Sequence, residues 1–167
     1  MFTPDQWLVA VQVLAILIPA TFVLSAIVSP RRPAFASGVT LGMAFLFASG
    51  TFLVQGAAAE PATSLGVRVD VVTCVMLLLV CSIGLVIVRY SRTYLHGDPG
   101  LARYFRWLLF TLGAVAALVI ANNLLVIAIA WTATSVFLHQ LLTFYSDRNA
   151  ALVAAHKKFL VSRLADL

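Results

Sequence analysis

The feature that most constrains this sequence is a nearly unbroken apolar stretch from Tyr104 to Tyr145. One helical crossing of a bilayer needs about 20 residues, and this stretch is roughly twice that long. Its one break is the pair Asn122-Asn123, and asparagine favours turns because its side chain bonds to the nearby backbone. We therefore predict two membrane-spanning helices, residues 104–121 and 124–145, joined by a tight turn.

The composition extends this prediction to the whole chain. Of 167 residues, 62% are hydrophobic and 10% are charged, whereas soluble domains are nearer half apolar and a quarter charged. This balance excludes an ordinary soluble globule, a disordered chain and a secreted disulfide scaffold. Further apolar runs predict three earlier crossings, at about residues 7–28, 34–54 and 69–90, and a sixth helix that begins near residue 150. The expected fold is all-α, a polytopic transmembrane helix bundle in the lipid bilayer, with residues 1–167 as a single membrane domain.

The polar segments between these runs predict the connections. The segment Gln55–Arg68 is rich in small and polar residues and contains Glu60-Pro61, which is typical of a loop. The segment Arg89–Arg106 is the most polar of the chain, and its Asp98-Pro99-Gly100 predicts a turn.

Small residues and thiols within the spans predict packing rather than chemistry. Gly38 and Gly42 are spaced as in a GxxxG pattern, which favours close approach of membrane helices. Cys74 and Cys81 are seven residues apart, which separates them by about 10 Å along a helix. Because disulfides need Cα atoms within about 7 Å, we expect two buried thiols.

The charged residues predict the orientation. With five crossings, Arg68 alone of the 11 Lys and Arg residues lies on one side, and the other ten lie on the opposite side. The basic side of a membrane protein is cytoplasmic, so the N-terminus is expected outside. The net charge of +5 is thus explained by topology. Nucleic-acid binding would need a solvated basic face, and we expect no nucleic-acid partner.

Polar residues at membrane depth are costly and therefore informative. Thr132, Ser135, His139 and Thr143 are spaced three and four apart, so they share one face of the fifth span. Imidazole ordinarily titrates near neutrality, and this stripe would suit a hydrated half-channel. The alternative is that the hydroxyl groups bond to backbone carbonyls and a neighbouring helix.

A second polar cluster lies in the last predicted helix and contains His156, Lys157, Lys158, Arg163 and Asp166. Arg163 and Asp166 are three apart, so an ion pair on one helical face is feasible. The alternative is a basic helix end whose side chains only reach the membrane surface.

Asp70 begins the third span, and there too a helix-start carboxylate is the simpler alternative to a transport residue. The sequence contains no P-loop, dinucleotide fingerprint, HExxH or nucleophile elbow. We expect the chain by itself not to be an enzyme.

A series of landmarks follows in order through residues 69–167. They are Val69-Asp70 at the start of a span, Tyr90-Ser91 and Tyr94-Leu95 at its end, Asp98-Pro99, Tyr104-Phe105, Asn122-Asn123-Leu124-Leu125, Trp131, and Lys157 with Phe159, Arg163 and Asp166. Together they resemble the N-terminal part of the large proton-translocating, antiporter-like subunit of respiratory complex I. In the energy-converting members a glutamate follows the tryptophan, whereas Thr132, which cannot titrate, follows Trp131 here.

One branch of that family matches further. The segments 139–145, 147–148, 154–159 and 162–164 are similar to the membrane subunits of DAB inorganic-carbon accumulation systems. The resemblance implies a bacterial inner-membrane subunit that couples cation entry, expected to be of protons, to one-way hydration of CO2 to bicarbonate. The hydration would occur on a large cytoplasmic zinc partner, DabA, so zinc is expected in the partner and no cofactor in this chain. The family's lysine, arginine and aspartate correspond to Lys157, Arg163 and Asp166.

The length of the chain and its function leave alternatives open. Members of this family have a dozen or more spans, so the resemblance implies either a fragment or a subunit whose remaining spans form a separate polypeptide. A second hypothesis is a proton-pumping subunit of a complex I-like NADH:quinone oxidoreductase or of a multisubunit Na+/H+ antiporter. A third is a structural membrane subunit without an ion path.

Overall fold

A computed structural model describes residues 4–28, 33–56, 61–64, 66–144 and 149–165. These residues form six helices and one two-stranded hairpin. The elements are α1 (Pro4–Val28), α2 (Pro33–Gly56), β1 (Ala62–Ser64), β2 (Val67–Val69), α3 (Val71–Tyr94), α4 (Leu101–Ile120), α5 (Leu124–Leu142) and α6 (Asn149–Ala165). Five of the described helices, α1 to α5, are long and apolar enough to cross a membrane. The predicted all-α transmembrane architecture is confirmed, and the N-terminus outside stays a prediction.

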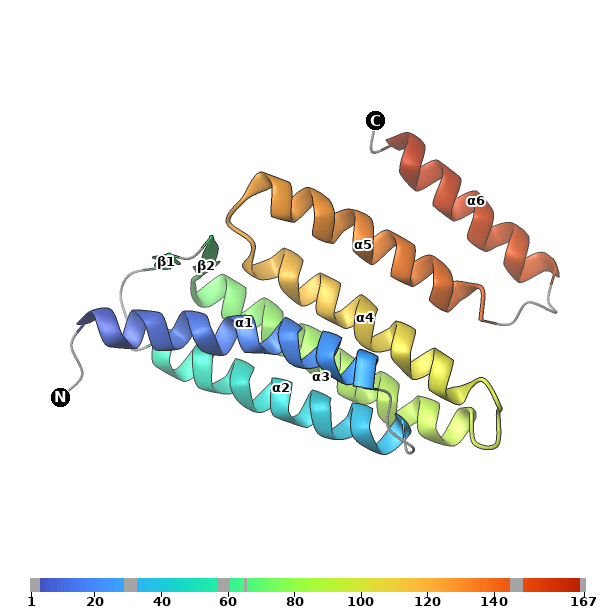
Figure 1. Cartoon of the computed structure of the whole chain (residues 1–167), viewed down its shortest axis with the longest axis horizontal. Coiled ribbons are helices and arrows are strands. Elements are labelled where there is room, and N and C mark those ends of the chain that lie inside the picture. Colours follow the sequence, from blue (N-terminus) through green and yellow to red (C-terminus); the bar gives the residue numbers. More distant parts are fainter. Residues whose placement is uncertain (1–3, 29–32, 57–60, 65, 145–148, 166–167) are drawn as a thin grey trace.

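Successive helices run up and down beside one another, as Figure 1 shows. α1 packs on α2 and α4, α2 packs on α3, α4 packs on α5, and α6 lies along the far side of α5. The hairpin and the α4–α5 turn lie at one end of the bundle, and the α3–α4 loop lies at the other.

The core lies among α1 to α4, where Phe22, Leu41, Leu77 and Phe105 are almost completely buried. Gly84 of α3 lies where three helices meet: an added Cβ would lie 2.7 Å from Leu41 Cδ2 and 3.1 Å from Leu112 Cδ1. Large apolar side chains also cover the outer faces. Such faces are stable in lipid, which is as apolar as leucine.

Capping residues fix the element ends that the sequence indicates. Asn123 precedes α5 and accepts a hydrogen bond from the backbone N–H of Leu125 at 2.9 Å. The backbone N–H of Asn122 donates to the carbonyl oxygen of Gly66, so the Asn turn is tied to the hairpin. Asp98 Oδ1 accepts from the backbone N–H of Gly100 at 2.7 Å. Both predicted turns are confirmed.

The structure corrects the prediction of a loop over Gln55–Arg68. Residues 62–64 and 67–69 pair as antiparallel strands, with Ala62 opposite Val69. Gly66, in the turn, has φ 75°, which suits glycine. Strands of three residues are too short for a periodic pattern to reveal. The helices also differ by up to a turn from the predicted spans, since α3 continues to Tyr94.

The predictions for the cysteines and for the two glycines have different outcomes. Cys74 and Cys81 are free and buried, as predicted. Gly38 meets the guanidinium group of Arg92 at the α2–α3 contact, whereas nothing lies within 4 Å of a Cβ added to Gly42. Gly38 therefore makes room for an arginine side chain, and the close approach of helices that the GxxxG spacing predicts is not seen at Gly42.

Candidate functional site

A groove of about 320 Å³ lies between α5 and α6 and reaches α4. We call it the α5–α6 groove, and its lining residues are Leu118, Trp131, Thr134, Ser135, Leu138, Lys158, Ser162 and Ala165. Its walls are mainly apolar, while a lysine and three hydroxyl residues also line it. This combination places a cation beside hydroxyl groups within a hydrophobic bundle.

Two polar atoms on the α6-facing side of α5 are buried without a protein partner. Ser135 Oγ and His139 Nδ1 have no hydrogen-bond partner among the described residues. The two residues are four apart and so lie one turn from each other on the same face. Buried polar atoms are nearly always hydrogen-bonded to protein or ordered water. A polar occupant such as water is the natural partner for both.

His139 joins α5 to α6 through ring contacts. Its ring lies 5.2 Å from the ring of His156, edge to face, and 4.8 Å from the ring of Phe159. His156 Nδ1 lies 2.7 Å from the carbonyl oxygen of Leu152, one turn back. Two imidazoles from different helices therefore meet beside the groove.

The cations of α6 divide between its faces. Lys158 is half-buried and lines the α5–α6 groove, whereas Lys157 is exposed and does not line it. The guanidinium carbon of Arg163 lies 5.7 Å from the centroid of the Phe159 ring, a cation–π distance. Asp166 lies outside the described residues, so its predicted pairing with Arg163 stays a prediction.

Thr134 and Thr143 bond to backbone carbonyls, as the alternative interpretation predicts. Thr134 Oγ1 donates to the carbonyl oxygen of Ala130 at 2.8 Å, and Thr143 Oγ1 donates to that of His139 at 3.0 Å. Thr132 is exposed and does not line the groove. Of the predicted stripe, the structure brings Ser135 and His139 against α6 and leaves Thr132 and Thr143 apart.

Asp70 is the N-cap of α3, at the end of the span. Its Oδ1 accepts from the backbone N–H and the hydroxyl of Thr73, at 2.8 Å and 2.9 Å, and Arg68 Nε lies 3.3 Å from its Oδ2. The backbone N–H of Thr73 lowers the pKa of Asp70, partial burial opposes this, and the Thr73 hydroxyl and Arg68 lower the pKa further. This geometry fits a helix cap.

Of the groove residues on α6, the sequence named Lys158 only as a member of the second polar cluster and did not single out Ser162. Their spacing of four was a usable signal, because residues four apart share a helix face. The choice between two consecutive lysines, however, depends on how α6 is rotated against α5. In the part of the chain that the structure describes, no three His, Cys, Asp or Glu side chains are grouped so as to hold a metal ion.

Comparison with known families defines the class of protein. Residues 58–105 match the family model described as NADH-Ubiquinone oxidoreductase (complex I), chain 5 N-terminus. The chain is 33% identical to the chloroplastic NAD(P)H-quinone oxidoreductase subunit 5 of Anthoceros angustus, over 60% of this chain and 14% of that protein. The chain is thus similar to the antiporter-like membrane subunits of complex I, as its landmarks implied.

Within that class, the similarity to one branch covers nearly the whole chain. The chain is 39% identical to the Probable inorganic carbon transporter subunit DabB of Hydrogenovibrio crunogenus, over 96% of its length. It is 37% identical to the Probable inorganic carbon transporter subunit DabB2 of Halothiobacillus neapolitanus, over 92%. The resemblance to the inorganic-carbon branch is therefore confirmed, and so is the multi-pass membrane location. The chain spans 32% of the length of each of these two relatives.

Proposed function

We propose that this chain forms part of the membrane subunit of an inorganic-carbon transporter, and that a proton moves along the α5–α6 groove to drive it. The observation that supports the path is a pair of buried atoms without a partner among the described residues, Ser135 Oγ and His139 Nδ1. Ser135 lines the groove together with Lys158, and the ring of His139 contacts His156 and Phe159 of α6. The similarity to DabB and DabB2 supports inorganic carbon as the transported substrate.

The proposed path uses three kinds of group. Lysine and imidazole take up and release protons, and serine hydroxyls both donate and accept, so they pass a proton on without holding charge. On the side of α6 that faces α4, Lys158 would take up and release the proton and Ser162 would pass it on. Ser135 would pass the proton between these residues and the pair His139 and His156. Proton loading changes the charge between α5 and α6, and this change would bias the conformation that a cytoplasmic partner senses.

In this proposal the chemistry takes place on a partner. A cytoplasmic zinc subunit of the DabA type would hydrate CO2 to bicarbonate, and the membrane subunit would make the reaction one-way. Coupling requires that the proton bind two conformations with different affinity. The chain's own residues supply the proton site, and the bundle supplies the helix pair that responds.

The proposal can be tested in cells that lack carbonic anhydrase and cannot grow in air. The complete membrane subunit and its cytoplasmic partner are expected to restore growth. Lys158→Gln and His139→Ala should abolish this rescue, whereas Lys157→Gln, on the exposed side of α6, should retain most of it. Lys158→Arg keeps the charge but cannot release a proton at neutral pH, and it should fail although the protein is inserted normally.

The amount of each variant in the membrane is first matched by immunoblot, so that growth reports on function and not on expression. If Lys158→Gln and His139→Ala both support growth as well as the unchanged protein, the groove is not the proton path. If Lys157→Gln fails while Lys158→Gln succeeds, the relevant lysine is the one that the family resemblance indicates.

A second candidate is a proton-pumping subunit of a quinone oxidoreductase, which the complex I family match favours. Against it, the family resemblance implies a glutamate after the tryptophan in the energy-converting members, where this chain has Thr132. If membranes containing the complete subunit acidify vesicles with NADH as electron donor and give no growth in air, this second function replaces the first.

A further inference from the structure

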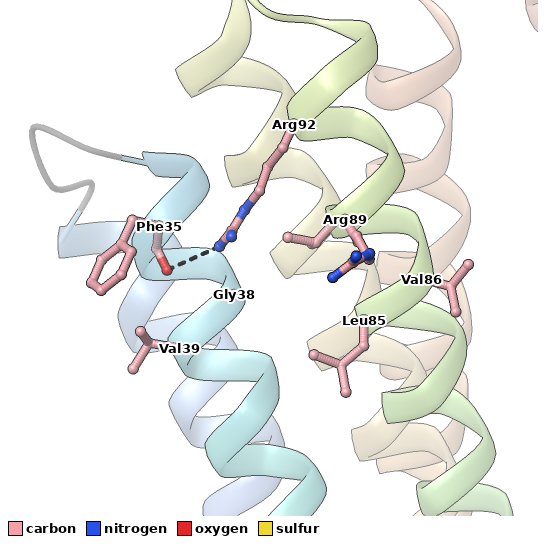
Figure 2. Close-up of a pocket in the computed structure, with 8 residues that line it drawn as sticks. Phe35, Gly38, Val39, Leu85, Val86, Arg89 and Arg92 are labelled. Atoms are coloured by element: carbon pink, nitrogen blue, oxygen red, sulfur yellow. Dashed lines mark hydrogen bonds between the residues drawn. The ribbon is translucent and has the colours of Figure 1, made fainter.

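A second groove, of about 470 Å³, lies between α2 and α3 at the end of the bundle where α3 meets the α3–α4 loop. We call it the α2–α3 groove, and Figure 2 shows it. Its lining residues are Phe35, Gly38, Val39, Leu85, Val86, Val88, Arg89 and Arg92. It is separate from the α5–α6 groove and shares no lining residue with it.

The groove has an apolar floor and a cationic end. Phe35 and Val86 are about two-thirds exposed, and they line the groove together with Val39 and Leu85. These residues belong to helical segments, 34–55 and 71–94, that can span the membrane. The floor therefore belongs to two segments that are apolar enough to lie in hydrocarbon.

Arg92 closes one end of the groove and is held in place by α2. Its Nε donates to the carbonyl oxygen of Ala34 at 2.8 Å, and its Nη2 donates to the carbonyl oxygens of Ala34 and Phe35. Gly38 permits this crossing because a Cβ there would collide with the guanidinium group. Among the described residues, the hydrogen bonds of Arg92 to α2 use Nε and Nη2, and none uses Nη1.

Arg89 supplies a second cation, one turn further into the membrane. It is exposed, and its guanidinium group extends into the gap between α2 and α3 (Figure 2). No described residue accepts a hydrogen bond from it. On the neighbouring face of α3, Tyr90 and Tyr94 stack with ring centroids 5.7 Å apart. Tyrosine gathers where a membrane meets water.

We propose that the α2–α3 groove binds one anionic phospholipid. Its phosphate would accept hydrogen bonds from Arg89 and from Nη1 of Arg92, and an acyl chain would cover the floor made by Phe35, Val39 and Val86. Basic pockets between transmembrane helices are the usual receptors for anionic headgroups. An acidic peptide fits less well, because its backbone polar groups would be left without partners against the apolar floor.

Lipid binding to the complete membrane subunit tests the proposal. The subunit is purified in mild detergent within its cellular assembly, stripped of lipid, and titrated with phosphatidylglycerol or with phosphatidylcholine of the same acyl chains. Native mass spectrometry counts the bound lipids. Arg89→Gln should weaken phosphatidylglycerol binding about fivefold, the effect expected of one arginine beside an anionic lipid. Arg106→Gln, an exposed arginine outside the groove, is the control and should change nothing.

A second pair of variants tests the floor without altering charge. Val39→Trp fills the groove and should reduce binding of both lipids. Leu46→Trp adds the same side chain two turns further along α2, where Leu46 is exposed and outside the groove, and should leave binding unchanged. Each substitution lies on an exposed position, so folding is expected to persist, and thermal unfolding checks it.

Four results would overturn the proposal. The first is equal affinity of the unchanged protein for the two lipids, and the second is unchanged lipid binding in Arg89→Gln and Val39→Trp. The third is competition by inorganic phosphate at concentrations similar to the lipid, which would indicate a site for free anions. The fourth is a structure of the assembly with a protein segment in the groove. Loss of growth in the proposed transport assay would not affect it, since the two grooves are distinct.

Discussion

At the scale of single residues, α5 carries two kinds of polar side chain. The hydroxyl groups of Thr134 and Thr143 bond to carbonyls of their own helix, as hydroxyl residues in helices commonly do. Ser135 Oγ and His139 Nδ1 are buried and have no such partner among the described residues. Membrane proteins retain costly polar groups mainly for function, so the second kind is where function should be sought.

This contrast gives a prediction for Ser135→Ala. A buried polar atom without a protein partner costs about 1–3 kcal/mol, so removing the hydroxyl should leave the unfolding temperature unchanged or raise it. Growth in air should fall at the same time. Thr143→Val is the matched control outside the groove: it removes a hydroxyl that is bonded to the carbonyl oxygen of His139 and should leave growth intact. A fall in stability of Ser135→Ala with normal growth would contradict the assignment.

Asp70 gives a prediction of pH dependence. The backbone N–H of Thr73 lowers the pKa of Asp70 below its ordinary value of 3.8. A carboxylate whose pKa is lowered by folding stabilises the native state above its unfolded pKa, and this stabilisation is lost as the pH falls through the folded pKa. At pH 7, Asp70→Ala should lower the free energy of unfolding by about 1 kcal/mol, as for other N-caps.

The measurement is thermal unfolding of the two proteins between pH 7 and pH 3. Their difference should be constant above about pH 4 and shrink below it. Arg68→Gln should have a small effect, because its pair with Asp70 is partly exposed and exposed pairs contribute little. A transport defect in Asp70→Asn, which keeps a capping oxygen, would show that Asp70 does more than cap α3.

At the scale of elements, the contact of α2 with α3 depends on Gly38 and Arg92 together. Gly38→Ala should displace the guanidinium group from the carbonyls of Ala34 and Phe35. Because this group is the far end of a flexible side chain, the loss of stability should be no greater than that of Arg92→Gln, which is on the order of 1–2 kcal/mol. Both changes remove the same interaction. The double variant should therefore be as stable as the less stable of the two single variants, and not less stable than it.

Gly42→Ala is the control for this pair. It lies one turn from Gly38, has open space around its Cβ position, and should be neutral or slightly stabilising because alanine favours helix. Thermal unfolding in detergent measures all four variants. Additive losses from Gly38→Ala and Arg92→Gln would show that the two residues act separately.

The elements also show what can be predicted from sequence. The apolar runs locate all five spans because a helix must be apolar over about 20 residues to cross a bilayer. Asn123 and Asp98 locate turns because their side chains bond to the local backbone. The hairpin at residues 62–69 was missed, because its strands are short and its pairing depends on contacts with Ala121 and Asn122.

Only part of the candidate site could be predicted from the sequence, because the site also depends on contacts between helices. Helical spacing places Ser135 and His139 on one face, but it does not say which helix that face meets. Lys157 and Lys158 differ by about 100° around α6, so the rotation of α6 decides which of them lines the groove. That rotation is set by the packing of His139 against His156 and Phe159, which spacing along one helix does not reveal.

At the scale of the whole molecule, burial is uneven. About 44% of the spanning window of α4 is buried, compared with 11% for α5. The packed core therefore belongs to α1 to α4, while α5 and α6 keep most of their surface for lipid or further protein. A helix pair with few buried contacts can shift more easily than a core helix, which suits the pair that bears the proposed proton path.

The arrangement of the two ends gives the last prediction, that of orientation. Arg89, Arg92, Arg103 and Arg106 lie near the α3–α4 loop, and Arg68 lies in the hairpin at the opposite end (Figure 1). Because basic segments stay in the cytoplasm, a cysteine placed by His96→Cys should react with a membrane-impermeant maleimide only after the cell is opened. Thr63→Cys in β1 should react in intact cells. Cys74 and Cys81 are buried, so the unchanged protein is the matched unlabelled control. The reverse labelling pattern would place the N-terminus in the cytoplasm, and a proton entering from outside would then meet the α3–α4 end of the bundle first.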